Sequence, residues 1–88
     1  MNDARRKELK KATELLSGIE AAYNEAKELI ESAKDGEREY ADNMPENMKS
    51  GERGEQAESA ADALEEAFDA MEQFDLSDVI SKIEEATA

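Results

Sequence analysis

The fold is decided by residues 9–44, LKKATELLSGIEAAYNEAKELIESAKDGEREYADNM. One set of positions in this stretch recurs at alternating steps of three and four residues, which is the spacing of a coiled-coil seam. All but one of these positions are apolar, and the set is Leu9, Ala12, Leu16, Ile19, Tyr23, Ala26, Ile30, Ala33, Glu37, Tyr40 and Met44. The pattern predicts one long helix over about residues 3–42.

The dipeptide Asp35-Gly36 is a turn signal that could instead divide this stretch into two shorter helices. A break would shift the register of the apolar positions, yet Tyr40 and Met44 remain in phase with the residues before the dipeptide. We therefore expect the helix to continue through Gly36, with a turn at this point as the alternative.

The helical pattern is interrupted at residues 42–47, DNMPEN. Proline lacks a donor N–H and disfavours helical geometry at the residue before it. The chain is therefore expected to reverse over a connector at residues 43–50, with room for one helical turn. Ser50 is the expected N-cap of the helix that follows.

Two further helices are expected after the connector, over about residues 51–74 and, after a kink or restart near Asp75, about residues 77–86. The arms before and after the connector would be about 60 and 54 Å long at 1.5 Å per residue. Such similar lengths predict an all-α fold, a coiled-coil-like antiparallel helical hairpin that forms a single domain over residues 1–88.

The apolar core of such a hairpin is thin, because alanine occupies many of the seam positions. Burial of a large apolar side chain contributes about 1.5–3 kcal/mol, whereas ordering each residue costs about 1.5 kcal/mol. We therefore expect a homodimer with a four-helix arrangement, which would cover the four aromatic side chains, Tyr23, Tyr40, Phe68 and Phe74.

The 88-residue chain has no His and no Cys, which removes the usual general base, the thiol nucleophile and the ligands of zinc and di-iron sites. Carboxylates remain, but they fall on faces expected to be solvated, where nothing separates the pKa values of an acid and a base. No phosphate-binding or calcium-binding loop is present. We expect a protein that is not an enzyme and binds no metal or cofactor.

No apolar run approaches the roughly 18 residues that a membrane span needs, and the N-terminal residues do not resemble a secretory signal. A cytoplasmic protein that does not contact a membrane is the expectation.

The most distinctive feature of the sequence is a row of acidic residues along the expected second helix. They recur at steps of three and four and are Glu55, Glu58, Asp62, Glu65, Asp69 and Glu72. We expect this acidic stripe to lie roughly opposite the apolar face as a rod of charge about 26 Å long. Its charge repeats about every 5 Å, which is comparable with the phosphates of duplex DNA. The competing interpretation is a solvated face that keeps the helix soluble, which is the commoner role of such a row.

A basic cluster, in contrast, lies at the N-terminus and consists of Arg5, Arg6, Lys7, Lys10 and Lys11. It could be a small phosphate or nucleic-acid patch, but no aromatic residues are interleaved with it. We expect it instead to pair with acidic residues near the C-terminus, namely Asp75, Asp78, Glu84 and Glu85, so that no direct nucleic-acid binding is predicted.

The connector region offers a possible recognition loop at an exposed turn, with Tyr40, Asp42, Asn43, Met44 and Asn47 as its candidate residues. The equally supported alternative is that Met44 and Met48 tuck under the turn and close the end of the hairpin.

Residues 39–47, EYADNMPEN, with residues 50–55, SGERGE, and residues 61–67, ADALEEA, resemble a family of small acidic proteins from bacteria, phages and mobile elements. The resemblance covers most of the chain after Glu37. It implies a helical hairpin and a mobile-element setting, but it assigns no activity and no functional residues. If the chain is encoded by a phage, the expected location is the cytoplasm of the host cell.

Small acidic proteins of mobile elements are often inhibitors of host defence, and several anti-CRISPR and anti-restriction proteins act as DNA mimics. By this analogy, we expect a non-catalytic decoy whose acidic stripe occupies the basic groove of a nucleic-acid-binding protein. The alternative is a coiled-coil structural or assembly adaptor without nucleic-acid mimicry.

Overall fold

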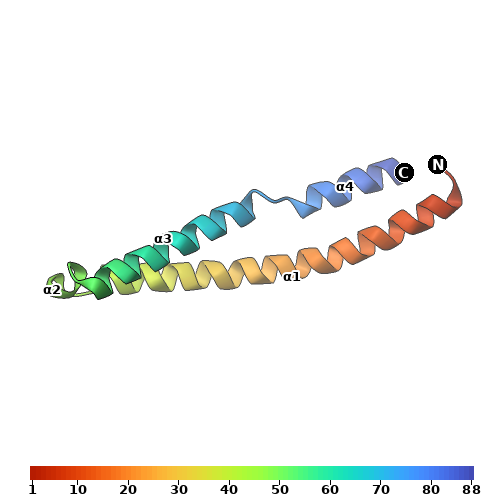
Figure 1. The fold of residues 1–88 in the computed structure, drawn as a ribbon. Coiled ribbons are helices and arrows are strands. Elements are labelled where there is room, and N and C mark those ends of the chain that lie inside the picture. Colours follow the sequence, from red (N-terminus) through yellow and green to blue (C-terminus); the bar gives the residue numbers. More distant parts are fainter. The chain divides into compact units, whose positions relative to one another are not determined.

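The computed structural model describes residues 1–88 and contains helices and no strands, which confirms the all-α class. Its helices are α1 (Asp3–Asp42), α2 (Glu46–Lys49), α3 (Glu52–Glu72) and α4 (Leu76–Thr87), labelled in Figure 1. Contacts group the chain into two compact units. Unit 1 is Met1–Glu25 with Phe74–Ala88, and unit 2 is Ala26–Gln73. The single domain expected from the sequence stays a prediction.

Helix α1 is one uninterrupted helix. Its N-terminus is capped by Asn2, whose Oδ1 accepts a hydrogen bond from the backbone N–H of Arg5 at 2.8 Å, and such a cap satisfies one of the N–H groups that a helix start leaves unpaired. Asp35 and Gly36 both lie within the helix. The turn considered for this dipeptide is therefore not formed.

Pro45 ends the first helical segment and begins the next. It adopts an extended conformation, with φ −59° and ψ 149°, as the N-cap of α2. Its carbonyl oxygen accepts hydrogen bonds from the backbone N–H groups of Met48 and Lys49, each at 2.9 Å. The connector therefore holds one helical turn between the two longer helices.

The expectation that Ser50 caps α3 is wrong. Ser50 is the C-cap of α2, with φ −82° and ψ −5°, and an N-cap residue needs an extended backbone instead. Gly51 has that extended backbone and takes the N-cap position without a side-chain hydrogen bond. The turn of α2 therefore determines where α3 begins.

Gly54, in the first turn of α3, lies directly against the end of α2. An added Cβ at this position would lie 2.2 Å from the carbonyl oxygen of Lys49 and 2.6 Å from its carbonyl carbon. Only a residue without a side chain permits this approach.

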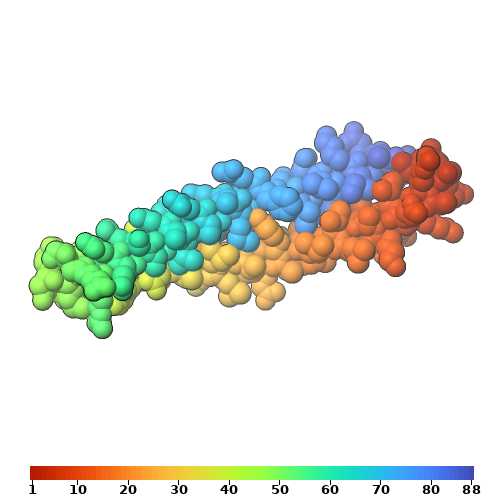
Figure 2. Space-filling model, in the orientation of Figure 1, coloured from red at the N-terminus to blue at the C-terminus, as the bar shows by residue number.

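The core of unit 2 is built mainly from small side chains. Ala41, Met44 and Ala57 form a buried cluster, against which the half-buried Met48 packs. Farther along α3, Ala61 is fully buried, at 0% exposed, and Phe68 is buried. Figure 2 shows the side chains of the connector and of the start of α3 packed together in unit 2.

Within unit 2, α3 runs in the direction opposite to α1. Contacts from the end of α1 reach the start of α3, and contacts from residues nearer the middle of α1 reach its end. The pairs that show this order are Ala41 with Ala57, Arg38 with Asp62 and Lys27 with Glu72.

In unit 1, the N-terminal part of α1 lies beside α4. The rings of Tyr23 and Phe74 are 5.5 Å apart at an angle of 58°, and the hydroxyl of Ser77 donates a hydrogen bond to the carboxylate of Glu20. Helix α4 starts after Asp75, whose side chain accepts a hydrogen bond from the N–H of Asp78 at 3.1 Å. The kink or restart expected near Asp75 is thus a restart with its own cap.

The coiled-coil seam expected on α1 is only partly covered. Leu16, Tyr23 and Ile30 are half-buried, whereas Ile19 and Tyr40 are 55% and 52% exposed. A single neighbouring helix covers only a narrow face of α1, so residues one step around the helix stay in solvent. The antiparallel hairpin over the whole chain and its dimer stay predictions.

Candidate functional site: the acidic surface of unit 2

The negative charge of the chain is concentrated in unit 2. This unit carries fifteen acidic and five basic residues, a formal net charge of −10, whereas unit 1 carries nine acidic and six basic residues, a net charge of −3. A surface that acts through negative charge is therefore to be sought on α3 and on the part of α1 that belongs to unit 2.

All six residues of the acidic stripe are exposed on α3. Their position relative to the apolar face differs from the expectation. The stripe follows the inward-facing residues by one position, as Glu58 follows Ala57 and Asp69 follows Phe68. One residue is about 100° of helix rotation, so the stripe flanks the contact with α1 and does not lie opposite to it.

Because of this flanking position, basic residues of α1 reach part of the stripe. Nη2 of Arg38 lies 2.8 Å from Oδ1 of Asp62 and 3.2 Å from Oε2 of Glu65. The hydrogen bond with Asp62 is the main reason that the pKa of the Arg38 guanidinium is raised above its ordinary value. Nζ of Lys27 lies 3.7 Å from Oε2 of Glu72, so three of the six carboxylates have a basic partner.

The other three carboxylates of the stripe, those of Glu55, Glu58 and Asp69, have no ion pair within 4.0 Å. Glu55 and Glu58 are neighbours at the connector end of α3. The stripe therefore keeps uncompensated charge mainly at this end of unit 2.

A second row of acidic residues, which was not predicted from the sequence, lies on α1. It consists of Glu28, Glu31, Asp35 and Glu39, four of the residues that line an open groove of about 520 Å³. Only Asp35 has a basic partner, Nζ of Lys34 at 3.8 Å. These acids recur at steps of three and four, so their spacing could have predicted the row. The apolar repeat of the same helix was interpreted instead.

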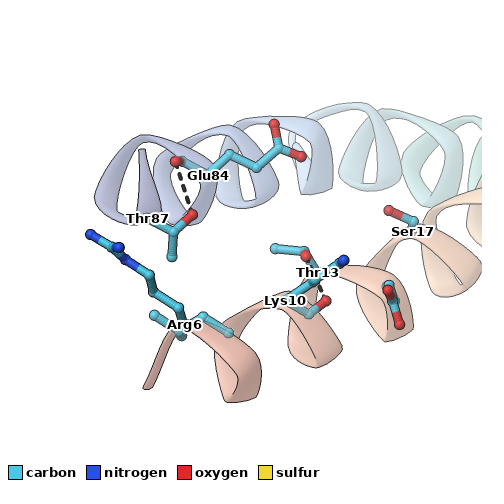
Figure 3. A pocket seen from close by; sticks show the side chains of 8 residues that line it. Arg6, Lys10, Thr13, Ser17, Glu84 and Thr87 are labelled. Carbon is cyan, nitrogen blue, oxygen red and sulfur yellow. Dashed lines mark hydrogen bonds between the residues drawn. The ribbon is translucent and has the colours of Figure 1, made fainter. Parts of the chain in front are cut away.

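The N-terminal basic cluster does not pair as expected. None of its side chains lies within 4.0 Å of a carboxylate of α4, so the predicted pairing with Asp75, Asp78, Glu84 and Glu85 is wrong. Arg6 and Lys10 instead line an open groove of about 490 Å³ (Figure 3). The same groove is lined by Glu14 and Glu84, and this mixture of charges gives it no preference for an anion.

Two of the three hydroxyl groups that line this groove, those of Thr13 and Thr87, are hydrogen-bonded to their own helices. Oγ1 of Thr13 donates to the carbonyl of Lys10 at 2.8 Å, and Oγ1 of Thr87 donates to the carbonyl of Glu84 at 3.1 Å, as the dashed lines in Figure 3 show. These hydroxyl protons are already used within the helices and are not directed at a ligand.

The candidate recognition loop combines both interpretations considered for it. Met44 is buried and Met48 is half-buried, whereas Tyr40 and the polar residues Asp42, Asn43 and Asn47 are exposed. An open, mostly apolar groove of about 430 Å³ runs beside them, lined by Gly36, Glu39, Tyr40, Asn43, Met44, Pro45 and Met48.

No three acidic residues converge in a way that could hold a metal ion, and no charged or polar residue is buried. No helix has the length and apolar character that would let it cross a lipid bilayer. The chain matches no family model, and neither a curated protein nor a solved structure is similar to it.

Proposed function

We propose that this chain is a non-catalytic binding protein whose acidic stripe occupies a basic, nucleic-acid-binding groove on a partner protein. It acts in the cytoplasm, as a helical hairpin that forms a homodimer of four helices. A phage or mobile element is its proposed origin and a host defence protein its proposed target. The origin follows from the resemblance of residues 39–67 to acidic proteins of such elements, and the target follows from the analogy with inhibitors of host defence.

One observation carries the proposal. Glu55, Glu58 and Asp69 are exposed and have no basic partner, although like charges at helical spacing repel one another. The five basic residues of unit 2 offset only a third of its fifteen acidic residues. A partner with a basic groove would supply the missing positive charge.

The test reverses the charge of only those stripe residues that have no basic partner. A variant with Glu55→Lys, Glu58→Lys and Asp69→Lys leaves the contacts of Arg38 and Lys27 in place, so that the fold is preserved. The matched control reverses three unpaired acids of unit 1, Glu8, Glu14 and Glu25, and changes the net charge by the same amount.

Immobilised wild-type chain is expected to retain a partner from a bacterial lysate at low salt and to release it when duplex DNA or 1 M NaCl is added, because screening is strong at high salt. The stripe variant should retain none of that partner, and the unit 1 control should retain it. Equal retention by the stripe variant and the wild type would exclude the decoy function.

The second candidate function is a coiled-coil adaptor that engages a partner helix through apolar contacts. The exposure of Leu15, Ile19 and Leu29 on α1 favours it. Binding of this kind depends little on salt, and substitution of these residues, with the acidic stripe intact, would abolish it.

A further inference from the structure

Two open grooves of unit 2 meet on α1. One is the mostly apolar groove at the connector, and the other is the groove lined by the second row of acidic residues. Gly36 and Glu39 line both of them, so the two grooves form one continuous surface, which we call the outer groove. All of its residues lie between positions 28 and 48 and belong to unit 2.

The connector end of the outer groove is apolar. Met44 is 7% exposed and Met48 is half-buried, whereas the ring of Tyr40 stands beside them 52% exposed. Methionine side chains adapt their shape to a partner, and an exposed aromatic ring offers a large contact area. This end of the groove therefore suits an apolar side chain.

The remainder of the outer groove is acidic. The carboxylates of Glu28, Glu31, Asp35 and Glu39 are all exposed, and at 1.5 Å per residue they extend over about 17 Å of α1. Only Asp35 has a basic partner, the adjacent Lys34. Three carboxylates in a row thus lack a counter-charge beside an apolar site.

The chain itself supplies no cation to the outer groove. Unit 2 has five basic residues, and none of them lines either part of the groove. Lys27 and Arg38 contact carboxylates of α3, and Nζ of Lys34 lies 4.6 Å from the centre of the Phe68 ring. The missing positive charge must come from a binding partner.

Gly36 lies where the apolar and acidic parts meet, and the fold does not require a glycine there. Its φ is negative, and an added Cβ would meet nothing within 4 Å. Glycine weakens a helix interior relative to alanine. A residue without a side chain does, however, let another chain approach the helix backbone closely.

From these features we infer that the outer groove binds a basic amphipathic helix of a partner protein. An apolar side chain of that helix packs among Tyr40, Met44 and Met48, and its lysine or arginine side chains face the second row of acidic residues. Amphipathic helices bind grooves in this way through side chains at helical spacing. Charge excludes a nucleic acid and a second unit 2, which carries a net charge of −10, because like charges repel. The inference goes beyond the proposed decoy function and uses no residue of the acidic stripe.

Synthetic peptides are the probe. Each is a helix of about 18 residues, about 27 Å long, with lysines at steps of three and four, and the two versions carry Phe and Leu at the N-terminal or the C-terminal end. The chain has only four methionines, so methyl NMR spectra of labelled methionine locate the site. One version should shift the signals of Met44 and Met48 and leave those of Met1 and Met71 unchanged.

A glycine pair tests the place where the two parts meet. Gly36→Arg should weaken peptide binding by about tenfold, because its side chain occupies the groove and repels lysine. Gly18→Arg is the matched control, since an added Cβ at Gly18 also meets nothing within 4 Å and the change in charge is the same. Equal affinity of the two variants would overturn the inference.

A second pair of variants tests the charge. The combination of Glu28→Lys, Glu31→Lys and Glu39→Lys should weaken peptide binding by about tenfold or more, because it replaces three ion pairs by repulsion. The stripe variant, with Glu55→Lys, Glu58→Lys and Asp69→Lys, changes the net charge equally and should retain most of the affinity. An equal loss in both would show a general attraction to an acidic protein and overturn the inference.

Three further results would overturn the inference. The first is equal binding of a peptide with glutamates in place of the lysines, which would show a purely apolar site. The second is a shift of the Met44 and Met48 signals with the concentration of the chain alone, which would assign the groove to a second copy. The third is the absence of any shift with both peptide versions at near-millimolar concentration.

Discussion

Nη2 of Arg38 lies 2.8 Å from Oδ1 of Asp62, a residue 24 positions farther along the chain. This contact joins α1 to α3 and at the same time takes one carboxylate out of the acidic stripe. Asp62 and Glu65 thus share one cation and Glu72 pairs with Lys27. Only Glu55, Glu58 and Asp69 are available to a partner without breaking contacts of the fold.

Arg38→Ala is expected to lower the melting temperature slightly, because it leaves Asp62 and Glu65 without their shared cation. The decrease should be measurable at 10 mM salt and nearly absent at 1 M, where charges are screened within about 3 Å. Because the pKa of Arg38 is raised, this contribution is present from neutral pH up to the ordinary pKa of arginine and is lost as the pH rises through the raised value. Thermal melts followed by circular dichroism measure the effect. Arg53→Ala, which removes no ion pair, is the control, and an equal decrease in both variants would contradict the prediction.

Gly54→Ala is expected to destabilise the fold by about 1–3 kcal/mol, the usual cost of forcing extra atoms into a packed site, because the new methyl group would overlap the carbonyl of Lys49. Gly18→Ala serves as the matched substitution. Its Cβ meets nothing within 4 Å, so the change should stabilise helix α1 by up to about 1 kcal/mol. Urea unfolding of both variants gives the two free energies, and the prediction requires that they differ in sign.

Asp75→Ala is expected to cost about 1 kcal/mol, since it removes the side chain that accepts a hydrogen bond from Asp78 at the start of α4. Ser50→Ala should leave the stability nearly unchanged, because Ser50 caps no helix N-terminus. Both are measured by urea unfolding. A larger loss for Ser50→Ala than for Asp75→Ala would mean that the helix starts have been assigned incorrectly.

Phe68 and Lys34 are expected to be energetically coupled, because Nζ of Lys34 lies 4.6 Å from the centre of the Phe68 ring. A double-mutant cycle of Phe68→Leu and Lys34→Gln should give a coupling of about 0.5–1 kcal/mol in favour of the wild-type pair. The same cycle with Arg53→Gln in place of the lysine change should give a value near zero. Coupling of the same size in both cycles would point to a general effect of charge.

The long helix could be predicted from sequence because many weak signals agree along it. Apolar residues keep one register from Leu9 to Met44, and this agreement outweighs the local turn preference of Asp35-Gly36. The restart near Asp75 could be predicted for a related reason, since Asp75 has a side chain suited to a helix N-cap.

Other features could not be predicted because they depend on small angles or on neighbouring turns. Ser50 has the right side chain for a cap, but the single turn of α2 gives it a helical backbone. The angle of the acidic stripe was misjudged because a shift by one residue rotates a face by about 100°. The angular position of the stripe on α3 determines whether Asp62 points only into solvent or contacts Arg38.

Alanine supplies much of the buried surface in unit 2, at positions 41, 57 and 61. A methyl group exposes little hydrocarbon to water when the chain unfolds, and exposure of hydrocarbon is the main source of the heat-capacity increase on unfolding. The increase should therefore fall below the roughly 12–15 cal/mol/K per residue of ordinary globular domains. The stability curve of this protein would be shallow, so that cooling weakens it little and heating unfolds it over a broad range of temperature.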